Sequence, residues 1–134
     1  MEDGIVLSQA GLPSYIASTY GMSFNEPWGR WTDGDVVVFR FTTPLPRSFS
    51  VELSGGAFGA NIGRPVKLRV GNAEREVVFD GGPFERVSTV KAEFDNTDGS
   101  DTIVILLPSA QAASEHDRRR LGLALRSIKV APTP

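Results

Sequence analysis

The chain has 134 residues, of which 40% are hydrophobic and 22% charged, and its formal net charge is -2. These values suit one globular domain with a buried core and argue against a disordered chain. The near balance of acidic and basic residues lacks the basic surface typical of nucleic-acid binding, and the absence of cysteine excludes disulfides, thiolate metal sites and a cysteine nucleophile.

No apolar run reaches the roughly 18 residues that would span a bilayer, so no direct membrane insertion is expected. Residues 1–4 lack the basic and apolar stretches of a signal peptide. A chain of this kind is expected not to export itself, which is compatible with its being one segment of a larger exported protein.

Short runs of β-branched and aromatic residues recur along the chain with turn signals between them. In the first half, the predicted strands are residues 4–7, 35–41, 48–53, 66–70 and 74–79. Residues 15–20 fit either a strand or one or two helical turns, and this choice stays open.

The second half continues the pattern, with strands predicted over residues 85–94, 102–107 and 121–130. Residues 110–115 are expected to form a short helical turn, and residues 131–134 a loose tail. In the last strand, alternation predicts Leu121, Leu123 and Leu125 on one face.

About eight strands at near-regular spacing, without a long helical period, predict an all-β fold. Our first choice is a two-sheet antiparallel β-sandwich over residues 1–130, jelly-roll-like (galactose-binding-like) and with at most one or two short helical turns. An immunoglobulin-like sandwich is second, because its Cys-Trp-Cys framework is absent.

Both tryptophans lie in one segment, residues 26–34. If this segment is extended, Trp28 and Arg30 share one face and Trp31 takes the other. One hypothesis is a ligand platform, in which an indole meets a sugar ring and Arg30 and Glu26 supply polar contacts. The alternative is that Trp31 fills the core and Arg30 forms a structural ion pair.

Residues 54–63 are rich in glycine but lack the Gly-Lys-Ser/Thr of a phosphate-binding loop. We interpret them as a long connection between strands, with Asn61 stabilising a turn. Such connections often form the rim of a binding site, so Asn61 is also a candidate ligand contact.

Residues 117–120 form a small basic cluster, and Arg119 within it is a candidate for binding an anion or a polar ligand. The alternative is a solvated turn in which these arginines pair with Asp117 and Glu115. Residues 95–101 are rich in oxygen ligands, but the EF-hand spacing fails, so a hairpin turn is expected and no metal is predicted.

No catalytic arrangement stands out. His116 is the only histidine, and its sequence neighbours Ser114 and Asp117 are no sign of a triad, because triads are assembled from distant segments. The domain alone is predicted not to be an enzyme, and no cofactor is expected.

Four segments together resemble a known family: residues 21–23, 26–31 with the sequence Glu-Pro-Trp-Gly-Arg-Trp, 57–63, and 119–125 with the sequence Arg-Arg-Leu-Gly-Leu-Ala-Leu. They are similar to a bacterial accessory domain at the C-terminal end of membrane-anchored phosphoglycerol transferases of the alkaline-phosphatase-like superfamily. Similar domains accompany some cell-envelope glycosyltransferases. The likeness extends from about Ile5 to Val130, and one departure is Arg118, where a small hydroxyl residue is expected.

The resemblance implies an accessory domain in the periplasm or on the outer face of the inner membrane, as part of a membrane-anchored parent. It implies recognition of envelope glycan in a carbohydrate-binding-like manner, for which the residue patterns above give the candidates Glu26, Trp28, Arg30, Asn61 and Arg119. The domain is expected to be a monomer. The alternative is a structural domain that packs on the parent's catalytic domain and binds no small ligand. That alternative predicts an exposed apolar patch on one sheet face.

Overall fold

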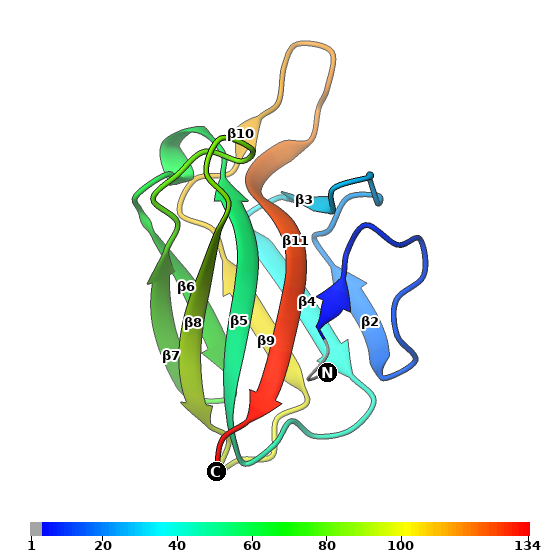
Figure 1. The fold of residues 1–134 in the computed structure, drawn as a ribbon, viewed down its shortest axis with the longest axis vertical. Helices are drawn as coiled ribbons and strands as arrows, with labels where there is room; N and C mark the ends of the chain where they lie inside the picture. The colour runs from blue at the N-terminus through cyan, green and yellow to red at the C-terminus, as the bar shows by residue number, and fades with distance from the viewer. Residues whose placement is uncertain (1–3) are drawn as a thin grey trace.

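The computed structural model describes residues 4–134 as two antiparallel sheets that enclose a shared core (Figure 1). Residues 1–3, part of the stretch in which no export signal is expected, lie outside this range. The prediction of an all-β, two-sheet antiparallel sandwich of jelly-roll-like form is confirmed.

The first sheet contains, in spatial order, β1 (Ile5–Val6), β11 (Arg120–Pro132), β5 (Ser48–Ala57) and β8 (Ser88–Asp95), while β3 (Arg30–Asp33) and β10 (Gln111–Ala112) also pair with β11. The second sheet has the order β2 (Ile16–Tyr20), β4 (Val36–Phe41), β9 (Thr102–Leu106), β6 (Pro65–Val70) and β7 (Ala73–Val78). A short 3-10 turn, η1 (Gly59–Asn61), joins β5 to β6.

The core lies between the sheets because their strands alternate in hydrophobicity. In β6, Val66, Leu68 and Val70 are buried while Lys67 and Arg69 are exposed, as the alternation predicts. Full burial of a large aliphatic or aromatic side chain contributes about 1.5–3 kcal/mol, so this alternation fixes which face each strand turns inward.

β5 is longer than the sequence indicates. Residues 54–63 were expected to connect strands, but β5 continues through Gly55 and Gly56 to Ala57. A Cβ on Gly55 would overlap the carbonyl oxygen of Ala124, so glycine here allows β11 to approach closely. The prediction of a connection over residues 54–57 was wrong because it rested on the low strand propensity of glycine.

The secondary structure of three other segments differs from the prediction or answers a question that the sequence left open. Residues 15–20 form strand β2 from Ile16 onward, and the helical alternative is excluded by their pairing with β4. The expected helical turn at 110–115 is wrong, because Gln111 and Ala112 pair with β11. The strand expected from residue 85 begins at Ser88.

The tail is also shorter than expected. β11 continues to Pro132, which lies opposite Phe49, and the amide of Thr133 donates to the Ser48 carbonyl at 2.9 Å. Residues 131–133 therefore extend the sheet, because β5 offers free ladder positions beside them.

A bulge in β11 separates leucines that were expected on one face. The pairing with β3 shifts between Leu121 and Ala124, so β11 has one extra residue there. Leu123 and Leu125 enter the main core, whereas Leu121 joins a second, smaller cluster with Trp31 and Ala124.

Candidate functional site

The segment before β3 folds back in a tight turn. The amide of Glu26 donates to the Gly29 carbonyl at 2.7 Å, and the amide of Gly29 donates to the Glu26 carbonyl at 3.1 Å. Gly29 has a φ of 152°, and a Cβ there would overlap the carbonyl oxygen of Leu125, so only glycine fits this approach to β11.

This turn brings the two indoles together. The ring centroids of Trp28 and Trp31 are 5.4 Å apart at an interplanar angle of 79°. The expectation that Trp28 and Trp31 take opposite faces is therefore wrong, because it assumed an extended segment.

Four aromatic rings form what we call the aromatic cluster: Trp28, Trp31, Phe58 and Phe84. Phe84 lies 5.0 Å from Trp28 and 5.8 Å from Trp31, and Phe58 lies 5.5 Å from Trp31, all edge to face. Trp31 is 8% exposed and forms the base of the cluster on Leu121 and Ala124, beside the main core and not within it. Phe84 is 49% exposed, and Trp28 is half-buried.

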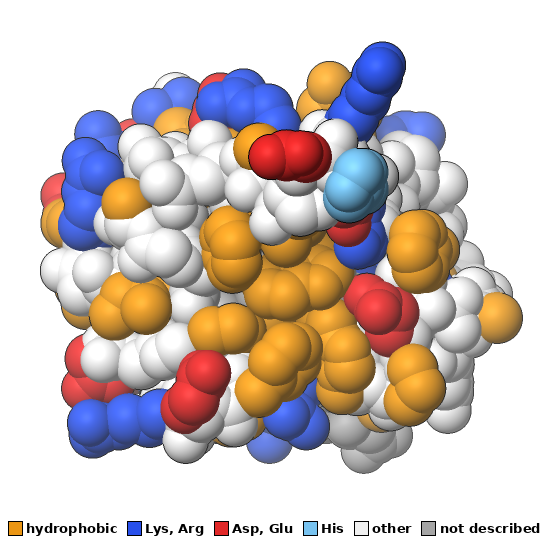
Figure 2. Space-filling view, turned by 90° about the horizontal axis from the view of Figure 1, so that it is seen from above, with side chains coloured by type: hydrophobic (Ala, Val, Ile, Leu, Met, Phe, Trp, Pro, Cys, Tyr) orange, Lys and Arg blue, Asp and Glu red, His pale blue; other side chains and the backbone are white. Residues whose placement is uncertain are grey.

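The aromatic cluster lies at one end of the sandwich. Its rings come from the turn before β3, from β3 itself, from the residue preceding η1, and from the connection between β7 and β8. Figure 2 shows hydrophobic side chains gathered in the centre of this end, with acidic and basic side chains and the histidine around them.

Beside the rings lies a polar group that we call the polar edge: Glu26, Asp117 and Arg119. Arg119 donates from Nη2 to Asp117 Oδ2 at 2.7 Å and from Nη1 to Ser23 Oγ at 2.9 Å. Its Nη1 lies 3.9 Å from Glu26 Oε2. The guanidinium also lies over the ring of Phe24, 4.9 Å from its centroid, and Phe24 is 62% exposed.

These contacts favour the charged forms of Asp117 and Arg119. Side-chain and backbone hydrogen bonds from Arg119 hold the pKa of Asp117 below its usual value. The same hydrogen bond with Asp117 raises the pKa of Arg119. Within residues 4–134, Glu26 Oε2 has no hydrogen-bond donor although it is shielded from solvent. The edge therefore places the Glu26 carboxylate, whose Oε2 is ion-paired with Arg119, beside exposed aromatic rings.

The structure gathers Glu26, Trp28 and Arg119, three of the five candidate residues, at this end. Arg30 points elsewhere, donating to the carbonyls of Leu7 at 3.1 Å, Gln9 at 2.9 Å and Ala10 at 3.2 Å. Backbone oxygens accept all three of its hydrogen bonds, and Arg30 forms no ion pair with residues 4–134.

Asn61 is fully buried. Its Nδ2 donates to the carbonyls of Phe58 at 2.8 Å and Ser109 at 2.7 Å, and its Oδ1 accepts from the Ser109 amide at 2.9 Å. Asn61 thus shapes its connection from inside and does not line the surface.

Sequence reasoning missed Phe24, Phe58 and Phe84. Phe84 carried a usable signal, since it follows Gly81-Gly82-Pro83, and a large apolar residue in such a turn has no strand to bury it. Phe24 and Phe58 carry no comparable local signal.

Residues 95–101 form the expected turn, in which Asn96 Nδ2 donates to the carbonyls of Leu45 and Ser100. The residues that the structure describes contain no cluster of histidine, aspartate or glutamate able to hold a metal ion. They also contain no helix with the length and apolar character needed to cross a membrane.

Solved structures of carbohydrate-binding modules share this fold. A mutant of CBM29-2, a family 29 carbohydrate-binding module, superposes with a TM-score of 0.57 at 14% identity, covering 95% of this chain and 89% of that chain. A CBM29-2 mutant complexed with mannohexaose gives a TM-score of 0.56 at 15% identity, with 95% and 89% covered. At this identity the likeness shows the fold alone.

Curated relatives share more of the sequence. Phosphoglycerol transferase I of Citrobacter koseri is 35% identical over 136 residues, which is 96% of this chain and 17% of that protein. Phosphoglycerol transferase I of Escherichia fergusonii is 33% identical over 136 residues, with the same coverage. The chain thus spans about a sixth of the length of these relatives, 17%, within their C-terminal region.

A family model described as "Domain of unknown function (DUF7024)" matches residues 1–132. The expected likeness to the C-terminal domain of phosphoglycerol transferases is confirmed. The chain belongs to the DUF7024 family.

Proposed function

We propose that this chain is a non-catalytic accessory domain of a bacterial phosphoglycerol transferase and that its aromatic end binds envelope glycan. The observation that carries the proposal is the pair of accessible rings, Trp28 and Phe84, beside the polar edge that contains Glu26. Sugar rings bind through apolar CH faces and hydroxyl donors, and this surface offers partners for both.

Two comparisons support the proposal. The family 29 neighbours are carbohydrate-binding modules by title, and one of them holds mannohexaose. The curated relatives are phosphoglycerol transferases, and this chain corresponds to a small part of them. We place the working protein in the periplasm or on the outer face of the inner membrane, with the transferase chemistry in another part of the parent.

The polar edge sets the expected ligand chemistry. Arg119 is engaged by Asp117 and Ser23, so its guanidinium has little left to offer an anionic group. Glu26 accepts hydrogen bonds from hydroxyls and repels anions. The site therefore suits neutral, hydroxyl-rich sugars.

The test is a titration of the chain with mannohexaose and with a glucose hexasaccharide, followed by amide NMR shifts and tryptophan fluorescence. Phe84→Ala is expected to weaken binding about threefold to tenfold, the equivalent of an aromatic contact worth about 0.5–1.5 kcal/mol. Tyr20→Ala is the matched control, because Tyr20 is a 69% exposed aromatic residue of β2 that belongs to neither the aromatic cluster nor the polar edge.

Amide shifts are expected in residues 24–31 and at Phe84. If neither sugar shifts these amides at about 10 mM, where a complex with a Kd of about 1 mM is mostly formed, the proposal is wrong. Equal weakening by Tyr20→Ala would contradict the location.

A second candidate function, docking on the parent's catalytic domain, is favoured by the outer face of the second sheet. Tyr20, Val38 and Val104 lie side by side in the ladder, and Val36 and Leu106 form the next row. Tyr20 is 69% and Val36 37% exposed. An apolar strip of this kind is typical of an interaction surface.

This candidate is tested by adding the remaining part of the Citrobacter koseri relative in trans. If the domain docks there, the amides of β4 and β9 are expected to become protected from hydrogen exchange. This protection is expected to be lost in the Tyr20→Arg variant and retained in the Phe84→Ala variant. Unchanged exchange in both strands would exclude it.

A further inference from the structure

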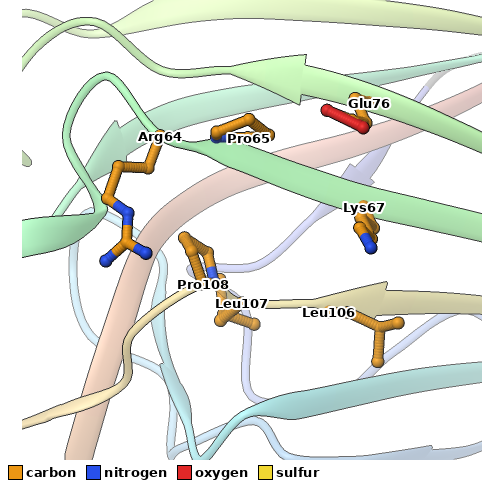
Figure 3. A pocket seen from close by; sticks show the side chains of 7 residues that line it. All are labelled: Arg64, Pro65, Lys67, Glu76, Leu106, Leu107 and Pro108. Atoms are coloured by element: carbon orange, nitrogen blue, oxygen red, sulfur yellow. The ribbon is translucent and has the colours of Figure 1, made fainter.

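A separate pocket of about 420 Å³ lies where β6, β7 and the end of β9 meet (Figure 3). Its apolar lining comes from Pro65, Leu106, Leu107 and Pro108, and its charged lining from Arg64, Lys67 and Glu76. The volume falls in the range of small-molecule sites, about 300–1,000 Å³. None of the residues of the aromatic cluster or the polar edge lines it.

Hydrogen bonds of Asn61 and of the backbone hold the segments that line the pocket in place. Asn61 binds both the amide and the carbonyl of Ser109, the residue after Pro108, and the Arg64 amide donates to the Asn61 carbonyl at 3.2 Å. The Leu107 amide donates to the Asp35 carbonyl at 2.9 Å. Both sides of the pocket therefore depend on one buried asparagine, which connects segments 48 residues apart.

The register of the sheet places the charged side chains. Lys67 lies opposite Leu106 on one side and Glu76 on the other. In Figure 3, the side chains of Arg64 and Lys67 stand on either side of Leu107 and Pro108. Their charged groups thus border an apolar floor.

The two cations form no direct ion pair with the described residues, although Lys67 attracts Glu74 electrostatically. Among residues 4–134, neither Arg64 nor Lys67 has an ion-pair partner or a side-chain hydrogen bond, whereas neighbouring Arg69 pairs with Glu74 at 2.7 Å. A guanidinium fork and an ammonium group are the donors that phosphate oxygens prefer. Glu76 leaves the pocket with one net positive charge, which matches a monoanion.

We propose that this pocket binds a glycerol phosphate diester. Arg64 and Lys67 contact the phosphate oxygens, Glu76 accepts from the glycerol hydroxyls, and Leu106 and Pro108 contact the carbons. The name of the curated relatives, phosphoglycerol transferase I, makes this group relevant to the parent. Such a group has two sources, a lipid headgroup and a substituted glycan.

The first experiment is an NMR titration of the chain with glycerophosphoglycerol at low salt, with glycerol as the neutral comparison. Saturable shifts are expected at residues 64–67 and 106–108, and added salt weakens them because the attraction is screened. Arg64→Ala and Lys67→Ala are each expected to weaken binding about fivefold or more, as removal of a charge-assisted hydrogen bond predicts.

The controls are Arg47→Ala and Lys91→Ala, which remove the same charges from exposed positions outside the pocket. All four side chains are exposed, so the variants are expected to fold, and urea midpoints check this. The proposal is overturned if glycerol gives the same shifts, if glycerophosphoglycerol gives none, or if the controls weaken binding as much.

The second experiment distinguishes the two sources. The lipid headgroup is identified as the source if the chain cosediments with phosphatidylglycerol vesicles but not with phosphatidylcholine vesicles, and if Arg64→Ala abolishes this cosedimentation. Binding of a phosphoglycerol-substituted oligosaccharide without vesicle binding identifies the glycan. The proposal is overturned if Arg64→Ala and Lys67→Ala both leave vesicle binding or oligosaccharide binding unchanged. None of these results depends on the aromatic end, so the pocket and the proposed glycan site are tested separately.

Discussion

Asn61 ties two distant connections together with one amide group. Its three side-chain hydrogen bonds reach Phe58 and Ser109, so the residue before η1 and the segment after β9 are held side by side. Phe58 belongs to the aromatic cluster, and Pro108 to the pocket. A single buried residue thereby supports both candidate sites.

Replacing Asn61 by alanine is expected to destabilise the chain by about 2–4 kcal/mol, because the partly buried amide and carbonyl of Ser109 both lose their partners, whereas the Phe58 carbonyl keeps the Asn61 amide. The free energy of unfolding in urea measures the loss. Asn25→Ala is the control, since the exposed Asn25 amide makes one bond of 3.2 Å to Ser8. A loss no larger than in the control would contradict this role.

The ion pair of Asp117 and Arg119 predicts a dependence on pH. The folded state holds the pKa of Asp117 below its usual 3.8, so the pair stabilises the chain above that pH. The stabilisation is lost as the pH falls through the lower, folded-state value. The Tm difference between the chain and Asp117→Asn is therefore expected to be present at about pH 6 and to shrink towards about pH 2.5.

Thermal unfolding followed by circular dichroism over this pH range is the measurement. Asp98→Asn serves as the control, because Asp98 forms no ion pair with the described residues. A Tm difference for Asp117→Asn that stays constant across the range would show that the pair contributes nothing through ionisation.

Among the elements, β5 shows how a close approach overrides local propensity. Gly55 lies opposite Leu125 of β11 and Ser88 of β8, in the middle of the first sheet. Its missing Cβ leaves room for the carbonyl of Ala124. The same region of β11 carries the turn of Gly29 and the base of the aromatic cluster.

Gly55→Ala is expected to cost about 2 kcal/mol or more, because the new Cβ meets backbone that cannot move aside easily. Gly11→Ala is a matched control, since no atom lies within 4 Å of a Cβ built there. Urea midpoints compare the two variants. Equal midpoints would mean that β11 can shift away from β5 without loss.

In the whole molecule, β5 and β11 are the inner strands of the first sheet, and β4, β9 and β6 those of the second. Inner strands bury their backbone hydrogen bonds, whereas β2 and β7 are edges. Stability is therefore expected to be uneven, with the lowest local stability at the edges and at the short strands β1 and β10.

Amide hydrogen exchange measured by NMR checks this order. Amides of β5 and β11 are expected to exchange only through global unfolding, and those of β2 and β10 through local opening at lower free energy. Protection in β2 equal to that in β5 would contradict it. Such a result would indicate that the edges are covered by another part of the fold.

Local sequence determined the strands and the fold class. The alternation in residues 66–70 and the β-branched run in 102–106 specify strands wherever they lie in the molecule, since a period of two fits only a half-buried extended chain. Segments with weak local preference were decided by pairing. Within residues 110–115, Gln111 and Ala112 joined β11, and residues 131–133 joined β5, because those strands offered hydrogen-bond partners.

The candidate sites depended far more on tertiary structure. The sequence singled out Glu26, Trp28 and Arg119, but the partners that make them a surface, Phe84 and Phe24, come from other parts of the chain. The sequence did not indicate Arg64 and Lys67 as ligand contacts. They are candidates because neither forms a direct ion pair with the described residues once the sheet has formed, and the sequence alone does not show this. Local pattern determines which face of a strand is buried, whereas only the folded chain decides which distant side chains meet and which charges stay free.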